Sequence, residues 1–457
     1  MTVSEEAVGG LGLMTTRDLK KDEVLIQVPQ DLILQSNGDD SIPREHRSVY
    51  RDVAWWAQLS LQLHFLDESY QTWLQSLPTV KQNQQSLPFH WSSQLIEELQ
   101  YSHLKDSVEL QRQLWKAEYD KIVTASSSLQ ISMEQFIWGC EMARSRAFSG
   151  SFSGKAFSPT PFLFTLLFMA VYLGLNMGTL DQAANGAGVV LCGLVFQDFI
   201  FPKLFSSKKK NYVICPMIDM ANHDTMKSIF ANVAFEYFAN GYSLATTTTA
   251  TTADVVVKEG TELFISYGPR SNDQLLQYYG FVEVDNPNDV YIMPPLREWD
   301  IGALEECCGR TFNAGRLQKL DKAGLLGLEG KMQDLDAENR GGGVVVDRIN
   351  GLDPAVLTAL RVLVSSEEEW TNAGEAIGNF VTVNSAGPTN ERLARLAATK
   401  ALQMELDSKP TTLEEDLQLS KQKNTLDDDE YEQKQLALQF RIQKKKLLKD
   451  AIQKIQP

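Results

Sequence analysis

The chain has 457 residues, of which 43% are hydrophobic and 22% are charged, a composition typical of a globular protein with two or three domains and a large core. Its formal net charge of −16 argues against binding nucleic acid through the phosphates. The five cysteines form no CxxC pair and no histidine cluster accompanies them. We therefore expect no metal site, no disulfide framework and a reducing compartment.

Strands come first in the chain, and helices follow. The first ten residues lack the cationic and apolar segments of a signal peptide. Residues 9–35 alternate in strand fashion around a polar turn at 18–23. From about 44 to 148 the apolar spacing becomes helical, with a first run around Leu59 and a second from Leu110 onward.

A long uncharged stretch interrupts this order. No charged residue occurs between Lys155 and Asp181, and a second uncharged run reaches Asp198. The first run contains about 17 strongly apolar residues, which is the lower limit for crossing a bilayer. A membrane contact through 156–204 and a buried helical pair both fit this pattern, and we favour the buried pair. The basic run at 208–210, which would suit an anionic membrane surface, then belongs to a solvated loop.

The second half of the chain passes from strands to helices. Residues 212–267 return to strand character, with a hairpin turn predicted at Asn240–Gly241. Beyond about 295 the pattern is helical and increasingly charged. Residues 412–455 predict two long surface helices joined by an acidic turn. The second of them carries Lys444–Lys446 toward its end, where cations complement the helix dipole.

Four short stretches combine residues that carry chemistry. Glycines at 10–12 mark a tight turn or a close backbone approach to a ligand. RSRAFSG at 144–150 ends a helical run. Because its two arginines cannot share one helix face, we expect one of them to point toward a carboxylate, and a solvated helix end is the alternative. PMIDMANHD at 216–224 crowds polar residues after a strand, which fits a turn as well as a metal site. ELFISYGPRSN at 262–272 ends a strand at Tyr267.

Four stretches, in their order along the chain, resemble the SET-domain protein methyltransferases. They are GLGLMTTRDLKKDEVLIQVP, RSRAF, DMANHD and ELFISYGPRSNDQLLQYYGF. Among these enzymes, the resemblance is to the Rubisco large-subunit lysine methyltransferase-like family. The resemblance implies an α+β fold, in which a β-rich SET domain is split by a helical insertion and followed by an all-α C-terminal domain. The corresponding segments are 1–48 for the N-terminal part of SET, 49–150 for the helical insertion, 151–210 for the apolar insertion, 211–292 for the C-terminal part of SET, and 293–457 for a helical substrate-binding-like domain.

The resemblance also implies a set of residues that bind S-adenosylmethionine (SAM). The glycine-rich strand lies against the cofactor, an Asn-His pair holds its amino-acid end and its adenine, and an arginine suits its carboxylate because the charge-assisted bond is strong. In this sequence these residues are Gly10, Leu11, Gly12, Arg146, Asn222 and His223.

A second set implied by the resemblance surrounds the amine that accepts the methyl group. Backbone carbonyls of Ser145 and Asp219 and the aromatic ring of Tyr279 line the target, and Tyr267 is the active-site tyrosine. Methyl transfer from a sulfonium is an in-line displacement, and a lysine ammonium must lose a proton before it can attack. We expect Tyr267 to orient the amine rather than to act as a strong base.

The function implied is SAM-dependent methylation of a lysine side chain in a protein substrate, and two alternatives stay open. One is methylation of a histidine. The other is a non-catalytic SET-like protein-binding module, associated with a membrane through 156–204; the presence of Tyr267, Asn222 and His223 favours catalysis. We expect a monomer without a nucleic-acid partner, located in the chloroplast or, alternatively, in the cytoplasm. Nothing in the sequence names the substrate protein.

Overall fold

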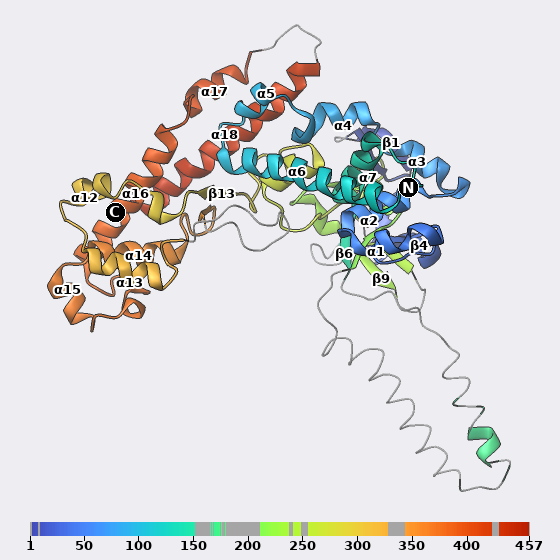
Figure 1. Cartoon of the computed structure of the whole chain (residues 1–457), viewed down its shortest axis with the longest axis horizontal. Helices are drawn as coiled ribbons and strands as arrows, with labels where there is room; N and C mark the ends of the chain where they lie inside the picture. Colours follow the sequence, from blue (N-terminus) through green and yellow to red (C-terminus); the bar gives the residue numbers. More distant parts are fainter. Residues whose placement is uncertain are drawn as a thin grey trace. The chain divides into compact units, whose positions relative to one another are not determined.

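The computed structural model describes residues 2–7, 10–150, 211–236, 241–247, 255–327, 343–422 and 429–456, together with scattered residues between 165 and 179. The chain divides into two compact units, and each of them is built from two segments (Figure 1). The first unit comprises Met1–Ser76 and Arg146–Ser266, and the second comprises Leu77–Ser145 and Tyr267–Pro457.

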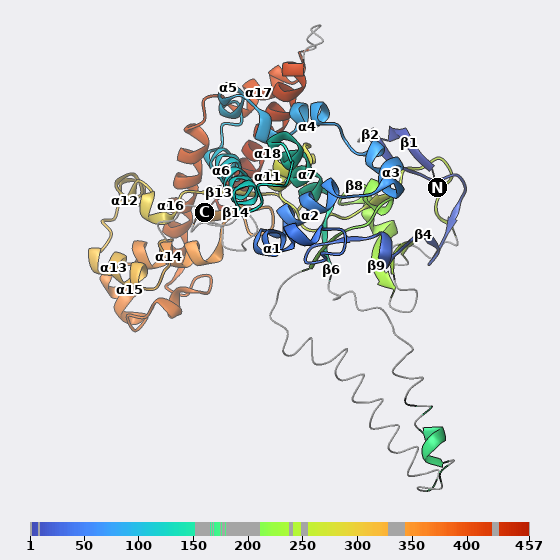
Figure 2. The same ribbon diagram turned by 45° about the vertical axis from the view of Figure 1, so that its right-hand side comes forward.

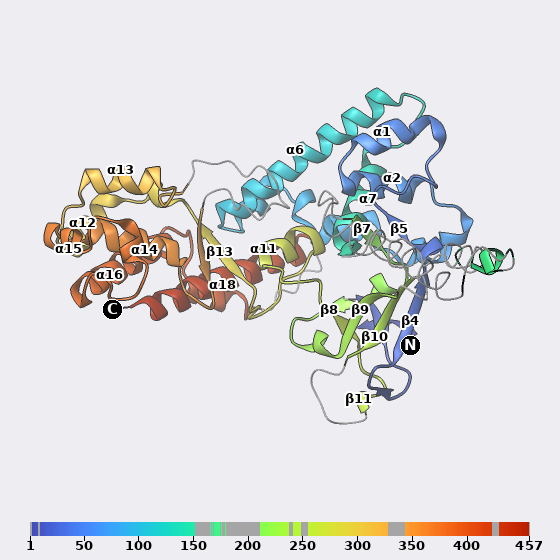
Figure 3. The same cartoon turned by 90° about the horizontal axis from the view of Figure 1, so that it is seen from below.

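The first unit contains several small sheets of short strands, and Figure 3 shows β4, β10 and β9 side by side. The described strands are β1 (Thr2–Ala7), β2 (Gly10–Met14), β3 (Leu19–Lys20), β4 (Val24–Pro29), β5 (Leu34–Gln35), β6 (Phe148–Gly150), β7 (Asn211–Ile214), β8 (Asn222–His223), β9 (Ala231–Glu236), β10 (Gly241–Thr246), β11 (Val255–Val257) and β12 (Phe264–Ile265). They pair as β1-β2, β4-β10-β9, β11-β3, β12-β8 and β5-β7-β6. The β12-β8 pair is parallel and the other pairs are antiparallel.

Alternating apolar side chains of these strands build the core of the first unit. Leu13, Val28, Val213, Leu244 and Leu263 are buried in one cluster that joins strands from both segments of the chain. The same unit contains three helices that precede the strand-rich second segment: α1 (Arg47–Asp52), α2 (Trp55–His64) and α3 (Gln71–Ser76). The first predicted helical run therefore forms α2, where Leu59 is fully buried.

Strands β9 and β10 pair antiparallel, as a hairpin requires, but Gly241 opens β10 opposite Glu236 and so is not in the turn predicted at Asn240–Gly241. Residues 237–240 between the two strands lie outside the described part of the chain. A Cβ atom at position 241 would stand 2.3 Å from the Val28 carbonyl oxygen on the neighbouring strand β4. Only glycine lets the two backbones approach so closely.

Replacing Gly241 by alanine is therefore expected to destabilise the protein by about 1–3 kcal/mol, because the β4-β10 ladder must shift to admit the methyl group. Denaturant unfolding followed by circular dichroism measures the change. Gly378→Ala is the matched control, since a Cβ atom there meets nothing within 4 Å. Equal midpoints for the two variants would contradict the expectation.

Helices dominate the second unit, as Figure 2 shows. Its first segment contains α4 (Val80–Ser86), α5 (Ser93–Glu97), α6 (Ser102–Ala125) and α7 (Met133–Arg146), whose last residue belongs to the first unit. After Tyr267 come α11 (Asn272–Gln274), a π-helix (Leu275–Tyr279), α12 (Ile301–Cys308), α13 (Ala314–Lys322), α14 (Pro354–Val364), α15 (Glu367–Asn372), α16 (Pro388–Asp407), α17 (Leu413–Leu419) and α18 (Asp429–Ile455). The predicted α+β class is confirmed. The C-terminal region is helical apart from an antiparallel ribbon of β13 (Val290–Met293) and β14 (Val344–Asp347).

The end of the chain differs from the predicted pair of long surface helices. Helix α17 has only 7 residues, whereas α18 has 27 and contributes Phe440 and Leu447 to the core of the second unit. Lys444 and Lys445, expected on the surface, are each only 2% exposed. Their charges are balanced by buried aspartates rather than by water and the helix dipole, as described below. A run of lysines therefore marks buried ion pairs here, and the surface interpretation was wrong.

The predicted apolar insertion at 151–210 lies outside the described residues, apart from the scattered positions between 165 and 179. Among the residues that the structure describes, no helix combines the length and apolarity needed to cross a membrane. The membrane interpretation depends on the stretch 156–204, and this finding therefore does not test it.

Candidate functional site

The Asn-His pair forms strand β8, which lies parallel to β12 with Phe264 opposite Asn222 and Ile265 opposite His223. The His223 Nδ1 lies 3.3 Å from the carbonyl oxygen of Ile265. This pairing joins the DMANHD stretch to the strand that ends two residues before Tyr267. The sequence predicted both stretches as functional, and the parallel pairing places them side by side.

The Asn222 side chain reaches the glycine-rich strand β2. Its Nδ2 donates to the Leu11 carbonyl oxygen at 3.3 Å and to the Glu262 Oε1 at 2.8 Å. Both amide hydrogens are thus used, while its Oδ1 accepts no hydrogen bond from any described residue. Gly10 and Gly12 flank Leu11 in β2, opposite Ala7 and Ser4 of β1. Sequence reasoning missed Glu262, although it stands in the same motif as Tyr267.

Arg146 pairs with Asp219, which confirms the expectation that one of the two arginines meets a carboxylate. Its Nη1 donates at 3.0 Å both to the Asp219 carbonyl oxygen and to its Oδ2. The indole N–H of Trp73 donates to the same carboxylate, at 3.1 Å to Oδ1 and 3.2 Å to Oδ2. Trp73 lies on α3, and no local pattern in the sequence connects it to Asp219.

The Asp219 side chain is 1% exposed although the residue is only half-buried, so its exposed surface is main chain. Burial raises the pKa of the Asp219 carboxyl, and the bonds from Arg146 and Trp73 act in the opposite direction. The arrangement anchors the side chain and leaves the main chain accessible. This main chain is the part that the resemblance assigns to the target amine.

The Nε donor of Arg146 is not used within the described residues. Its Nε is buried and has no hydrogen-bond partner among the described residues. A buried donor without a partner costs free energy, and a ligand carboxylate would satisfy it. Together with the open Oδ1 acceptor of Asn222, this donor fits the carboxylate and ammonium of an amino-acid group. The residues of the first unit thus fit the end of SAM that the resemblance assigns to them.

Tyr267 and Tyr279 stack on each other in the second unit, with ring centroids 4.8 Å apart and planes inclined by 24°. The turn after Tyr267 contains Gly268 at φ 93°, and the Arg270 Nε donates to the Tyr267 carbonyl oxygen at 3.0 Å. Tyr279 ends the π-helix, and Gly280 stops it in the left-handed conformation at φ 75°. This short helix thus brings Tyr279 back to Tyr267.

A residue from elsewhere in the chain caps the start of this helix. Ser271 occupies the N-cap position but its side chain makes no capping bond. The Asn272 main-chain N–H is instead bonded to Asp289 Oδ1 at 2.9 Å. Capping by a distant aspartate cannot be inferred from the local sequence.

Ser145 lies near the end of α7, and its hydroxyl donates to the Glu141 carbonyl oxygen one turn earlier at 2.8 Å. Glu141 is buried, and its carboxylate lies 2.6 Å from the Asn83 Nδ2 and 2.5 Å from the His90 Nε2. The predicted residues therefore come together as Leu11 with Asn222, as Arg146 with Asp219 and as Tyr267 with Tyr279. Ser145 is bonded to its own helix.

The interpretation of the PMIDMANHD stretch as a metal site finds no support. In the part of the chain that the structure describes, no group of three or more histidine, cysteine, aspartate or glutamate side chains is arranged to hold a metal ion.

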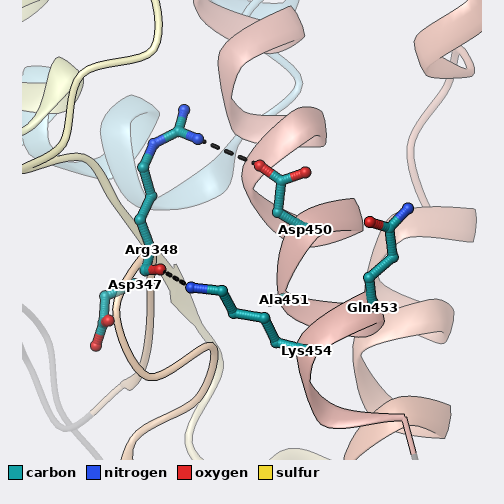
Figure 4. A pocket seen from close by; sticks show the side chains of 6 residues that line it. All are labelled: Asp347, Arg348, Asp450, Ala451, Gln453 and Lys454. Atoms are coloured by element: carbon teal, nitrogen blue, oxygen red, sulfur yellow. Dashed lines mark hydrogen bonds and ion pairs between the residues drawn. The ribbon is translucent and has the colours of Figure 1, made fainter.

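A cavity of about 490 Å³ lies elsewhere in the second unit (Figure 4). Its walls are the turn after β14 and the last turns of α18, and the residues that line it are Asp347, Arg348, Asp450, Ala451, Gln453 and Lys454. The Arg348 Nη1 is bonded to Asp450 at 3.2 Å, and Lys454 donates to the Arg348 carbonyl oxygen. None of the predicted site residues lines this cavity.

Comparison with known proteins identifies the C-terminal region and the fold. Residues 316–448 match the family model described as Rubisco LSMT substrate-binding. The structure of the SET domain of LSMT bound to methyllysine and AdoHcy is similar with a TM-score of 0.59 and 18% identity, over 99% of this chain and 86% of that chain. The structure of Rubisco LSMT bound to AdoMet gives 0.57 and 17%, over the same shares. At this identity the likeness establishes the fold, and the predicted SET fold is confirmed.

One relative that matches by sequence is a lysine methyltransferase by name. The ribosomal lysine N-methyltransferase set10 of Schizosaccharomyces pombe is 30% identical over 112 residues, which are 23% of this chain. The match spans about a fifth of the length of that relative, 19%.

Proposed function

From a chain that has the fold of Rubisco LSMT and carries a substrate-binding domain of that family, we infer a SAM-dependent methyltransferase that acts on a lysine side chain of a protein. The observation that carries the proposal is the β8-β12 pairing, which joins the Asn-His pair to the strand before Tyr267. From β8 the Asn222 side chain also reaches the Leu11 carbonyl oxygen of β2. All four stretches that carry the resemblance are thus joined by hydrogen bonds. One matching relative is a lysine N-methyltransferase by name and one similar structure is bound to methyllysine, which supports the same reaction.

Each site residue then has a role in binding the cofactor. The Arg146 Nε, which lacks a partner among the described residues, would hold the SAM carboxylate, and the open Asn222 Oδ1 would accept from its ammonium. Glu262 keeps the Asn222 amide in the orientation that leaves Oδ1 open. Bound SAM supplies a methyl group on a positively charged sulfur.

Other residues act on the lysine. The Asp219 carbonyl accepts an N–H of the amine, and Arg146 fixes that carbonyl by its bond at 3.0 Å. The Tyr267 hydroxyl orients the neutral amine, and Tyr279 provides an apolar wall that disfavours the ammonium form and so lowers its pKa. The substrate protein itself is unassigned. A chloroplast location is part of the proposal on the resemblance alone, and a fluorescent fusion of the full-length protein tests it.

Two measurements test the function. Calorimetry should detect SAM binding to the full chain, and Asn222→Ala should weaken that binding at least about tenfold because a hydrogen bond to a charged group is lost. Labelled SAM should then transfer its methyl group to a protein in a cell lysate, and mass spectrometry should locate it on lysine. SAM binding without transfer would favour a non-catalytic module, and methylhistidine in the product would favour the alternative substrate.

A further inference from the structure

The helix that carries Tyr279 has an unusual conformation, which requires stabilising contacts from other residues. Leu275–Tyr279 is a π-helix, a form that is rare and that occurs mainly as short pieces at functional sites. Its first four residues are buried, whereas Tyr279 is half-buried and stacks on Tyr267. The conformation of this single turn therefore decides where the Tyr279 ring lies against Tyr267.

Asn272 closes a loop around this turn. It is fully buried at the start of the helix, and its side chain is bonded to the main chain of Glu283, beyond the helix end. The Asn272 Nδ2 donates to the Glu283 carbonyl oxygen at 3.0 Å, and the Glu283 N–H donates to the Asn272 Oδ1 at 2.9 Å. The two ends of the Tyr279 segment are thus held together by one side chain.

Asp289 and Lys444 hold Asn272 in turn. The Asp289 carboxylate accepts from the Asn272 main-chain N–H at 2.9 Å and from its Nδ2 at 3.1 Å. The Lys444 Nζ, from α18, donates to Asp289 at 2.7 Å and to the Val290 carbonyl oxygen at 2.6 Å, and lies 3.0 Å from Asp273. Lys444 and Asp289 are 2% and 1% exposed, so the pair is removed from water.

Burying an ammonium group has an energetic cost that the neighbouring carboxylates offset. Burial lowers the pKa of Lys444, but Asp273 and Asp289 outweigh it and raise that pKa above its ordinary value. A hydrophobic residue would fill the same space without that cost. An ion pair at this place instead fixes the direction of the Asp289 oxygens, on which both bonds to Asn272 depend.

We propose that Lys444 and Asp289 are positioning residues of the transfer reaction, which act through Asn272 to hold Tyr279 against Tyr267. The inference rests on the proposed function and extends it. Helix α18, which overlaps the end of the region that matches a substrate-binding family model, then also orders the Tyr267–Tyr279 pair. Figure 3 shows α18 running beside β13, the strand that follows Asp289.

The neighbouring lysine provides a matched control. Lys445 is also 2% exposed on α18, and it is bonded to Asp416 at 2.6 Å and to Gln100 and Thr411 at 2.8 Å. None of these partners belongs to the chain segment that runs from Tyr267 to β13. Lys444→Met and Lys445→Met therefore remove the same buried charge from the same helix, and only the first touches the Tyr279 segment.

The experiment compares the two variants in the full chain by steady-state kinetics and by hydrogen exchange of peptides covering 272–283. Lys444→Met should lower kcat about tenfold with KM for SAM changed less than about twofold, because the tyrosines are displaced while cofactor binding is unaffected. Its exchange in this segment should accelerate about tenfold or more. Lys445→Met should leave both kcat and this exchange at the wild-type level at a temperature where both variants are folded.

Equal effects of the two variants, or an unchanged kcat in folded Lys444→Met, would overturn the proposal. If Lys444→Met does not fold, the double variant Lys444→Met/Asp289→Asn removes both charges of the pair, and wild-type kcat in that variant would overturn it instead. Failure of the proposed function is a separate result, because the wild-type chain would then transfer no methyl group. In that case faster hydrogen exchange of residues 272–283 in Lys444→Met, but not in Lys445→Met, would still show that Lys444 holds this segment. Unchanged exchange in Lys444→Met would refute that role.

Discussion

Replacing Tyr267 by phenylalanine should lower kcat for methyl transfer by about a hundredfold or more while the protein stays folded, because the change removes only the hydroxyl that orients the amine. The phenyl ring that remains keeps the stacking on Tyr279, whose centroid lies 4.8 Å from that of Tyr267. KM for SAM should be unchanged, since Tyr267 has no assigned contact with the cofactor. Single-turnover transfer of labelled methyl groups measures the effect on the chemical step.

Tyr119→Phe is the control for this change. It also removes one tyrosine hydroxyl, which belongs to helix α6 and is bonded to the Ile131 carbonyl oxygen at 3.1 Å. That variant should keep wild-type kcat. Full transfer activity in Tyr267→Phe would remove Tyr267 from the reaction.

Replacing Arg146 by methionine should have the second large effect, on both binding and stability. The variant loses the donor proposed for the SAM carboxylate, and calorimetry should show affinity reduced by about tenfold or more. It also leaves the Asp219 carboxylate, whose side chain is 1% exposed, with Trp73 as its only donor from another described residue. Breaking a buried ion pair in this way costs about 3–5 kcal/mol of unfolding free energy.

The stability loss in Arg146→Met should depend on pH with a defined sign. Burial already raises the pKa of Asp219, and removing Arg146 raises it further. A folded-state pKa above the unfolded value means that the ionised form destabilises the fold, so protonation restores stability. The difference in midpoint between the variant and the wild type should shrink as the pH falls toward about 4.

Arg361→Met is the matched control for the Arg146 variant. Arg361 and Glu391 form an ion pair at 2.7 Å with both side chains less than a tenth exposed, far along the chain in the helical region. This control should lose less stability, because Glu391 keeps its bond from Arg395 at 2.8 Å, and it should keep its affinity for SAM. Equal SAM affinity in Arg146→Met and in the wild type would contradict the assigned role of Arg146.

The sequence was informative where function depends on local order. Residue types at fixed spacing predict the strand that stops before Tyr267, the glycine that ends the Tyr279 helix and the strands on either side of Asn240. The resemblance of four ordered motifs then led to the fold that structural comparison supports.

Contacts between distant positions were beyond such reasoning. Trp73 and Asp219 are 146 positions apart, and Lys444 and Asp289 are 155 positions apart. A lysine run has the same local pattern whether it is solvated or buried, and only its partners decide between the two. The burial of Lys444 and Lys445 follows from aspartates that no periodicity connects to α18.

The interleaved chain path of the second unit has a consequence for its synthesis. Leu99, Leu104 and Val108 belong to the same core as Phe440 and Leu447, so helices made early share a core with the last helix. During translation α5 and α6 leave the ribosome long before α18 and must wait with apolar surface exposed. A fragment limited to residues 316–448 lacks these early helices and ends inside α18. Such a fragment should aggregate, whereas co-expression of the complete segment Tyr267–Pro457 with the segment Leu77–Ser145 should recover soluble material.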